Sequence, residues 1–352
     1  MSEPGLFIHH TFISWKDLPA YASEEKAVIF AQQWLSPQIE FEVKTSGSTG
    51  EPKTIVLKRE QMEASIRGTA SLLKPTEKDH IFLPLNPETI GGMMAIARAI
   101  EWNISLTISK PEANPMLSLL EKHTYTFCSL VPLQAIDILT DELSKRKLNQ
   151  FRKILLGGAS ISENLLTALQ SLQPVFYHTY GMTETCSHIA ARQLNGENKQ
   201  DYFYPLPEVN VGLNEEECLW IEAPSALHHP LQTNDIARIH VSGGFEILGR
   251  KDRTIISGGI KIQLDEMETL FAPLLENRPF FCFGETDTRF GTRHVLYIEG
   301  LPFDTEALMR QLHEIAPPYK APKAIIFADR FERTLSGKID RINTSQKWAK
   351  TN

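Results

Sequence analysis

Residues 45–53 read TSGSTGEPK, and this stretch decides how the rest of the chain is interpreted. Hydroxyl side chains and two glycines fill its first six positions. Several backbone N–H groups and hydroxyls of such a loop can turn toward one anion, and glycine lets the backbone come close to it. The loop is not the Walker type, because Lys53 follows Gly50 by three residues with Pro52 between them. We interpret it as a polyphosphate-binding loop; the alternative is an ordinary surface loop.

Length and composition limit the classes of protein that the chain can belong to. Its 352 residues favour two domains, and its net charge of −7 argues against a nucleic-acid-binding surface. The N-terminus has no basic segment followed by an apolar core, and no apolar run approaches the ~18 residues of a membrane span. The four cysteines are far apart and form no C-x-x-C pair, which favours free thiols in a reducing compartment. We therefore expect a cytoplasmic protein without a membrane span.

Hydrophobic periodicity predicts alternating strands and helices up to about residue 180. Strands are expected at 81–85, 103–109, 125–131, 151–156 and 174–178, and helices at 24–35, 61–73, 91–102, 116–123, 133–143 and 162–172. Such alternation is typical of a layered α/β domain with a largely parallel sheet.

The pattern changes after about residue 200. Short, closely spaced strands are expected at 218–221, 236–241 and 245–248, which indicates a small β subdomain from about 205. Beyond residue 249 the pattern is α+β, with helices at 265–275 and 305–316 and strands at 280–284, 295–299 and 324–327. We therefore predict a first domain at 1–249 and a small α+β C-terminal domain at 250–352, joined at the polar run GRKDR, residues 249–253.

Three short segments at predicted strand ends carry candidate binding residues. They are GGA at 157–159, YGMTET at 180–185 and TND at 233–235. Ligands of open α/β sheets bind outside the carboxyl ends of the strands. The first could let a flat base lie against the backbone, the second offers an aromatic ring, a hydroxyl and a carboxylate, and the third a carboxylate for ribose hydroxyls. The alternative for each is a structural turn.

Two further segments lie in the C-terminal part: SGGIK at 257–261, which predicts a glycine hairpin, and TLSGK at 334–338, which puts Lys338 after a turn. The order and spacing of all these segments resemble the adenylate-forming superfamily of acyl-CoA synthetases, luciferases and adenylation domains. The resemblance covers roughly residues 45–341. Within it, the YGMTETCSHIA and GGIKI runs are most similar to the o-succinylbenzoate–CoA ligases of menaquinone biosynthesis.

The resemblance implies a role for each motif residue. The β- and γ-phosphates of ATP would be held by Thr45, Ser46, Gly47, Ser48, Thr49, Gly50 and Lys53. Gly158, Ala159 and Tyr180 would enclose adenine, Thr183 would contact the α-phosphate, and Glu184 would bind Mg²⁺. Asp235 and Arg250 would bind ribose, and Lys338 would bridge ATP and the acyl carboxylate. Asp252 would be the hinge between two domain orientations, and Gly258, Gly259 and Lys261 would line the pantetheine tunnel for coenzyme A.

The chain also departs from the superfamily pattern. Only 44 residues precede the phosphate loop, so we expect the usual N-terminal subdomain to be missing or reduced. Asn86 stands where many members carry a histidine, and Asn234 is the middle residue of the third motif. These departures bear on the acyl pocket. Arg98, four residues after Met94 on a predicted helix, is our candidate for holding a second carboxylate of the acid; the alternative is that it reaches solvent or pairs with Glu101.

The sequence therefore predicts an ATP-dependent acid–CoA ligase that acts through an acyl-adenylate on a small carboxylic acid. Our first choice of acid is o-succinylbenzoate. The alternatives are a ligase for another aryl or acyl acid, an enzyme that loads a carrier protein, and a nucleotide-binding protein without turnover. The oligomeric state is left open.

Overall fold

The structure is a computed structural model that describes residues 3–9, 11–45, 53–120, 123–275, 278–334 and 337–348. Its largest sheet has the order β11-β10-β9-β8-β7-β5-β6-β1-β2. The strands are β1 (Gly5–Ile8), β2 (Thr11–Ser14), β5 (His80–Leu83), β6 (Ser105–Ile108), β7 (Phe127–Leu130), β8 (Lys153–Leu156), β9 (Val175–Met182), β10 (Ser187–Gln193) and β11 (Tyr204–Pro205). The central pairs from β1 to β9 are parallel, and the edge strands β2, β10 and β11 pair antiparallel. The predicted parallel α/β layer is thus confirmed.

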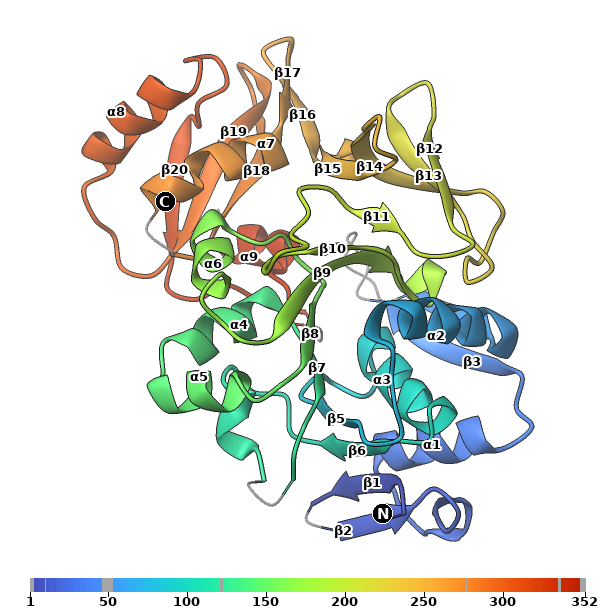
Figure 1. The fold of residues 1–352 in the computed structure, drawn as a ribbon. Coiled ribbons are helices and arrows are strands. Elements are labelled where there is room, and N and C mark those ends of the chain that lie inside the picture. The colour runs from blue at the N-terminus through green and yellow to red at the C-terminus, as the bar shows by residue number, and fades with distance from the viewer. Residues whose placement is uncertain are drawn as a thin grey trace.

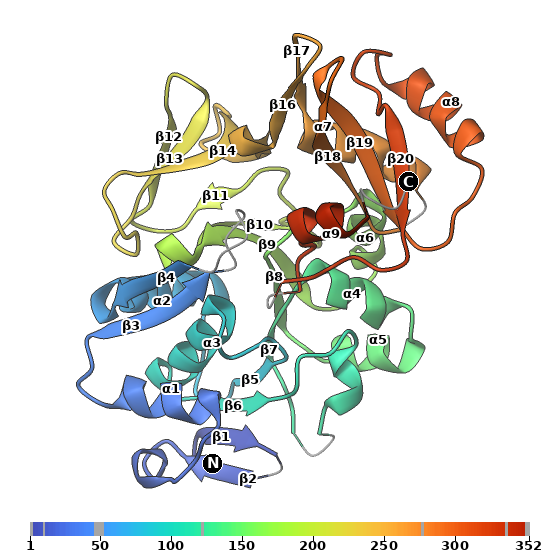
Figure 2. The ribbon, with the colours of Figure 1, turned by 180° about the vertical axis from the view of Figure 1, so that it is seen from behind.

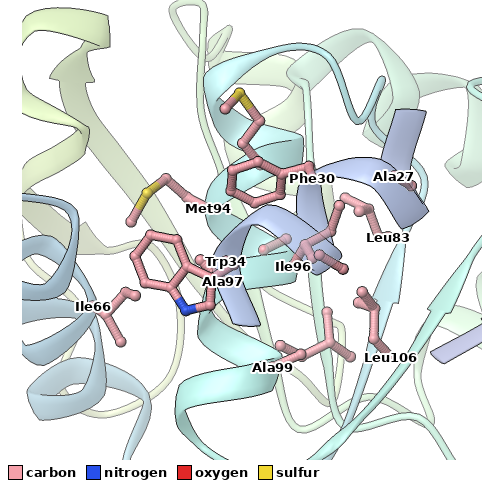
Figure 3. Packing of buried hydrophobic residues seen from close by; sticks show 14 of the residues in the cluster. Ala27, Phe30, Trp34, Ile66, Leu83, Met94, Ile96, Ala97, Ala99 and Leu106 are labelled. Atoms are coloured by element: carbon pink, nitrogen blue, oxygen red, sulfur yellow. The ribbon is translucent and has the colours of Figure 1, made fainter. Parts of the chain in front are cut away.

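Helices cover both faces of this sheet (Figure 1). They are α1 (Lys26–Leu35), α2 (Arg59–Leu73), α3 (Ile90–Glu101), α4 (Pro132–Leu139), α5 (Glu142–Leu148) and α6 (Glu163–Leu169). Side chains alternate between the faces along each strand, so Ile81 and Leu83 pack with α1 and α3, whereas Phe82 packs with α4. Figure 3 shows the first of these cores, where Trp34 of α1 and Met94 of α3 lie together. Two separate apolar layers therefore fix the sheet from either side.

A second hairpin, β3 (Glu40–Thr45) with β4 (Lys53–Lys58), stands outside the large sheet and leads into α2. A four-stranded sheet follows β11, in the order β12 (Asn210–Leu213), β13 (Cys218–Glu222), β14 (Leu231–Ile239) and β15 (Phe245–Arg250). Its apolar face packs Leu219 and Phe245 against Ile189 and Ala190 of β10. The predicted β-rich subdomain is therefore present and is attached to the edge of the large sheet.

The C-terminal part forms its own sheet, above the large one in both views (Figures 1 and 2). It contains β16 (Thr254–Ser257), β17 (Ile260–Gln263), β18 (Phe280–Asp287), β19 (Gly291–Glu299) and β20 (Ala324–Ala328), with helices α7 (Leu264–Phe271), α8 (Thr305–Ile315) and α9 (Arg341–Trp348). A 3₁₀ turn, Lys251–Arg253, connects β15 to β16. The predicted boundary at 249/250 lies beside this turn and stays a prediction.

Two predicted helices were wrong. The helix at 116–123 is absent from the described residues there, and only a 3₁₀ turn, Pro115–Ser118, forms; the Ser118 hydroxyl donates to the Pro115 carbonyl at 2.8 Å, so a side chain competes for the helical bond. The helix at 133–143 is divided into α4 and α5, because the Asp141 carboxylate accepts from the Ser144 N–H at 2.8 Å and starts a new helix. Strands also formed where none was predicted, namely β1, β2, β3, β4, β10, β11 and β12.

The four cysteines are free and buried, as the sequence predicted. In the described part of the chain, no helix is both long and apolar enough to cross a bilayer.

Candidate active site

The pairing of β3 with β4 brings the two ends of the predicted phosphate loop together. Thr45 at the end of β3 pairs with Lys53 at the start of β4. Strand β4 also contacts the 3₁₀ turn Thr183–Thr185, so the base of the loop lies near the YGMTET segment. The predicted ligands Ser46, Gly47, Ser48, Thr49 and Gly50 lie outside the described residues, and so does the side chain of Thr45.

Local hydrogen bonds fix the YGMTET segment, which consists of the last three residues of β9 and the turn that leads to β10. The Thr185 hydroxyl donates to the Ser187 carbonyl at 2.6 Å and accepts from the Met182 N–H at 3.0 Å. The Glu184 carbonyl accepts from the Leu227 N–H at 2.8 Å, which ties the turn to the β-rich subdomain. Thr183 and Glu184 keep half-buried side chains on this fixed turn. A carboxylate and a hydroxyl are the hard oxygen donors that Mg²⁺ prefers, so the donor set fits this ion.

Tyr180, Asp235 and Arg250 form a polar cluster next to the turn. The Tyr180 hydroxyl donates to Asp235 Oδ2 at 2.5 Å, and Arg250 Nη1 lies 3.5 Å from Asp235 Oδ1. Burial and the Asp235 charge raise the pKa of Tyr180 above its usual value, so the phenol stays a donor. Arg250 also pairs with Asp252 through bonds of 2.9 and 2.7 Å. The cluster therefore presents a buried carboxylate between a neutral donor and a cation.

Asp235 does not lie in a turn, which corrects the structural alternative for that segment. It lies within strand β14 and pairs directly with Arg250 of β15. The Thr233 hydroxyl accepts from the Asp235 N–H at 3.0 Å and donates to the Leu219 carbonyl. Burial alternates along this strand, with Thr233 and Asp235 buried and Asn234 exposed, so the segment lies inside a strand and not at a strand end as the sequence predicted.

The Gly157–Ala159 segment ends β8 and comes close to two neighbours. A Cβ at Gly157 would lie 2.7 Å from the Thr179 hydroxyl, and Gly158 has a φ of +85°, which favours glycine. His178 Nε2 contacts the Ala159 carbonyl at 3.1 Å, and burial lowers the pKa of His178 to about 4. The neutral imidazole of His178 therefore holds this turn through a hydrogen bond to the Ala159 carbonyl. The sequence did not indicate this contact.

Lys338 reaches this same place from the C-terminal part. Its Cε lies 3.6 Å from the position that a Cβ on Gly158 would occupy. The Lys338 carbonyl accepts from the Thr334 N–H at 2.8 Å, which closes the tight turn that carries it. Lys338 is exposed to solvent, but the nearby protein partly desolvates its ammonium group. This desolvation, together with Arg250 and Arg341, lowers the pKa of Lys338 against the opposing charge of Asp235. The structure thus brings together five residues that are far apart in sequence: Gly158, Tyr180, Asp235, Arg250 and Lys338.

The glycine hairpin is not part of this cluster. Strands β16 and β17 form the predicted hairpin, and Gly258 and Gly259 occupy its turn with φ of +56° and +81°. Both views place this hairpin at the outer end of the C-terminal sheet, away from β9 (Figures 1 and 2). Lys261 is exposed on it.

Arg98 is buried, so the alternative that it reaches solvent is wrong. It is 4% exposed on α3, and Glu101 bonds to Trp34 instead. Its Nη2 donates to the Ser187 hydroxyl at 3.0 Å, whereas its Nε has no hydrogen-bond partner among the described residues. Burial lowers the pKa of Arg98 to about 10. A buried guanidinium that no described carboxylate pairs with is costly, and an anionic ligand would offset that cost.

Sequence reasoning missed the residues around Arg98. His188 lies next to Ser187 on β10, and Thr69 of α2 faces it. The available signal was a Ser-His pair inside the run CSHIAA, where neighbouring side chains are small or apolar.

Comparison with known proteins identifies the family. The family described as AMP-binding enzyme matches residues 43–218. A 2-succinylbenzoate–CoA ligase of Lactococcus lactis subsp. lactis (strain IL1403) is 28% identical over 316 residues, which are 85% of this chain and 69% of that ligase. The crystal structure of an acyl-CoA synthetase (AMP-forming)/AMP-acid ligase II-like protein from Dyadobacter fermentans DSM 18053 is 34% identical, with a TM-score of 0.64, and the match covers 95% of this chain and 98% of that one.

A third match concerns the fold alone. The o-succinylbenzoate coenzyme A synthetase of Bacillus subtilis, solved with ATP and magnesium ion, has a TM-score of 0.74 at 22% identity, over 86% of this chain and 69% of that one. Together, the motifs, the clustered site and these matches show that the chain belongs to the AMP-binding enzyme family and is an AMP-forming acid–thiol ligase.

Proposed function

We propose that the enzyme is an o-succinylbenzoate–CoA ligase, which uses ATP to activate the acid and then transfers the acyl group to coenzyme A. In the first half-reaction a carboxylate oxygen attacks the α-phosphorus, the bond from that phosphorus to the bridging oxygen breaks, and pyrophosphate leaves. In the second, the coenzyme A thiolate attacks the acyl carbon, AMP leaves, and the thiol proton passes to solvent. This reaction is the one used in menaquinone biosynthesis.

The clustered residues fit the first half-reaction. Two anions must meet, so catalysis depends on cations and positioning. Lys338, next to Gly158, would place its ammonium between the α-phosphate and the acid, and Thr183 would contact the α-phosphate. Asp235 and Arg250 would hold the ribose, and Gly158, Ala159 and Tyr180 the adenine. The described ends of the phosphate loop, Thr45 and Lys53, would direct it toward the β- and γ-phosphates, which the residues from Ser46 to Gly50 would bind.

Glu184 would hold Mg²⁺. Among the described residues, no hydrogen bond or ion pair that we identify occupies its carboxylate, and its side chain is half-buried on a fixed turn. The ion, when bound, supplies positive charge beside the phosphate oxygens.

The single observation that favours this acid is the buried charge of Arg98. o-Succinylbenzoate has a second carboxylate, remote from the reacting one, and a simple benzoate does not. Arg98 lies on α3 beside Ser187, which pairs with Met182 directly before Thr183 and Glu184. We infer that its guanidinium receives the remote carboxylate.

The substrate assignment is tested with a panel of acids. Purified enzyme is supplied with ATP, Mg²⁺, coenzyme A and either o-succinylbenzoate, benzoate or a fatty acid, and coenzyme A-dependent AMP release is measured. o-Succinylbenzoate should give the highest kcat/KM. Better turnover of a monocarboxylic aromatic acid would refute the assignment, and AMP release without a requirement for coenzyme A would favour a carrier protein as the acceptor.

The Arg98→Ala variant tests the role of the guanidinium. We expect the KM for o-succinylbenzoate to rise roughly ten- to a hundredfold, because a charged hydrogen bond to the substrate is lost, while the KM for ATP stays unchanged. Arg67→Ala, at an exposed arginine of the neighbouring helix α2, is the matched control and should behave as the wild type. If the kinetics of Arg98→Ala were unchanged, Arg98 would not bind the acid.

A further inference from the structure

Arg98 stands at the end of a chain of hydrogen bonds that crosses from α3 through β10 to α2. Its Nη2 bonds to Ser187 Oγ at 3.0 Å, Ser187 Oγ to His188 Nδ1 at 3.2 Å, and His188 Nε2 to Thr69 Oγ1 at 3.1 Å. We propose that Arg98 is held ready for the remote carboxylate of the acid by a relay of three positioning residues, Ser187, His188 and Thr69. This inference rests on the proposed function of Arg98.

Each bond of the relay has a defined direction. The Thr69 hydroxyl donates its only proton to the Ser65 carbonyl at 2.9 Å, so its oxygen must accept from His188 Nε2–H. In a neutral imidazole the other nitrogen, Nδ1, is then an acceptor and takes the Ser187 proton. The Ser187 oxygen is left to accept from Arg98. The relay therefore selects one tautomer of His188 and one orientation of the guanidinium.

The charges around His188 keep it neutral. It is 6% exposed, and burial and the neighbouring Arg98 charge both lower its pKa well below the usual value. A second cation here would repel Arg98, and its protonated Nδ1 could no longer accept the Ser187 proton. In neutral His188, Nδ1 accepts the Ser187 proton, and the Ser187 oxygen is then directed at the guanidinium as an acceptor.

The relay bonds to Nη2 of Arg98 and leaves its Nε, which has no hydrogen-bond partner among the described residues, available for the substrate. A guanidinium free to rotate would lose side-chain entropy when it bound a carboxylate. Fixing one Nη in advance reduces that loss and aims the remaining donors. The expected consequence is a lower KM for an acid with a remote carboxylate, with little effect on an acid that lacks one.

The chain contains a matched control for the relay. On the opposite face of the sheet, His80 Nε2 bonds to the Thr107 hydroxyl at 2.8 Å, and both residues are buried. This second Thr–His pair faces Tyr125 and His123 and is separate from Arg98. Thr107→Val therefore removes a similar bond and measures the purely structural effect.

The experiment compares Thr69→Val, Thr69→Ser and Thr107→Val in AMP release. Thr69→Val should raise the KM for o-succinylbenzoate roughly three- to tenfold, as expected for the loss of one buried hydrogen bond, and leave kcat, the KM for ATP and the KM for benzoate unchanged. Thr69→Ser keeps the hydroxyl and should restore the wild-type KM. Thr107→Val should lower the melting temperature without moving the KM for o-succinylbenzoate.

Ser187→Ala provides a second test if Thr69→Val does not fold. It removes the direct partner of Arg98 and should raise the same KM at least as much. The relay is refuted if Thr69→Val and Ser187→Ala both keep the wild-type KM, if the KM values for ATP and benzoate rise equally, or if Thr107→Val has the same effect as Thr69→Val.

A spectroscopic measurement separates the relay from the substrate assignment. With ¹⁵N-labelled histidine, and the His188 signal identified by its loss in His188→Gln, the wild type should show an Nε2–H tautomer that does not titrate between about pH 6 and pH 9. An Nδ1–H tautomer or a titration in that range would refute the relay. Failure of the wild type to use o-succinylbenzoate, with this signature intact, would refute the substrate and not the relay.

Discussion

At the scale of single residues, the position of Lys338 is the most informative. It belongs to the last part of the chain, yet its side chain lies beside Gly158, which ends a strand of the large sheet. Its charged neighbours are Arg250, Arg341 and Asp235, and two of the three carry the same charge as the lysine. A lysine placed among cations and partly desolvated gains most when an anion arrives, which is the electrostatic situation that adenylate formation requires.

Lys338→Ala should therefore abolish most of the adenylation activity and spare the transfer of an acyl group from a supplied acyl-adenylate to coenzyme A. One cation acting in the transition state contributes roughly 3–4 kcal/mol, or about 10²–10³ in rate. ATP–pyrophosphate exchange measures the first half-reaction and thioester formation the second. The pKa of Lys338 is lowered, so the lysine loses its proton at a pH below the usual pKa of 10.5. The ATP–pyrophosphate exchange of the wild type should therefore decline on the alkaline side below pH 10.5.

The control for this prediction is Lys347→Ala, at an exposed lysine of α9 that pairs with Glu332. It should keep both half-reactions. An equal loss of both half-reactions in Lys338→Ala would contradict a role confined to the first.

At the scale of elements, one carboxylate connects three segments of the C-terminal part. Glu268 of α7 bonds to Arg253 beside β16, to the Cys282 N–H of β18 at 2.8 Å and to Arg341 of α9 at 3.1 Å. Arg253 in turn bonds to Asp265 at 2.6 Å, and its side chain is only 12% exposed. Because α9 begins at Arg341, three residues after Lys338, this network also fixes the turn that presents the lysine.

Glu268→Gln should destabilise the C-terminal part by roughly 3 kcal/mol, because it takes the shared carboxylate from the buried Arg253 and the partly exposed Arg341. Urea unfolding measures the change. The matched control is Glu306→Gln on α8, where an 88% exposed glutamate lies 3.9 Å from Arg310 and should contribute less than about 0.5 kcal/mol. Equal stability of the two variants would mean that the network contributes no more than a surface pair.

At the scale of the whole molecule, the structure shows one orientation of two parts that share a short connection. The 3₁₀ turn Lys251–Arg253 joins β15 to β16, and the residues around it bond back to the first part: Arg250 to Asp235, and Lys251 to Glu216 at 2.6 Å. In this orientation Lys338 lies at the clustered site and the glycine hairpin lies far from it (Figure 2). Transfer of the acyl group to coenzyme A would require the glycine hairpin at the site and Lys338 away from it. A rotation of the C-terminal part about the connection would provide this arrangement.

Asp252→Pro should therefore keep ATP–pyrophosphate exchange and lose thioester formation, because proline fixes the φ angle that a hinge must change. Asp252→Ala is the control, since it also loses the carboxylate that pairs with Arg250 but keeps the rotation, and it should retain both half-reactions. If Asp252→Pro kept the wild-type rates of both half-reactions, the hinge would have to lie at another residue.

The sequence by itself determined the class of fold and the candidate residues of the site. The alternation of apolar runs depends on local periodicity, so the parallel α/β layer, the β-rich subdomain and the α+β end were predictable before the structure. The motif residues could be proposed as candidates because their order and spacing resemble those of a known superfamily. Local signals failed where a side chain competes with the backbone, as Ser118 does, or where a cap restarts a helix, as Asp141 does.

Only the tertiary structure decided which of these residues meet. No spacing shows that Lys338 lies beside Gly158, that Asp235 is buried in a strand facing Arg250, or that His178 supports Ala159. Arg98 is the clearest case: at a helical position four residues after Met94 it could equally have reached solvent, and its burial against Ser187 results from how α3 packs on β10. Burial and charge pairing arise from contacts between distant segments, and these contacts are absent from any single stretch of sequence.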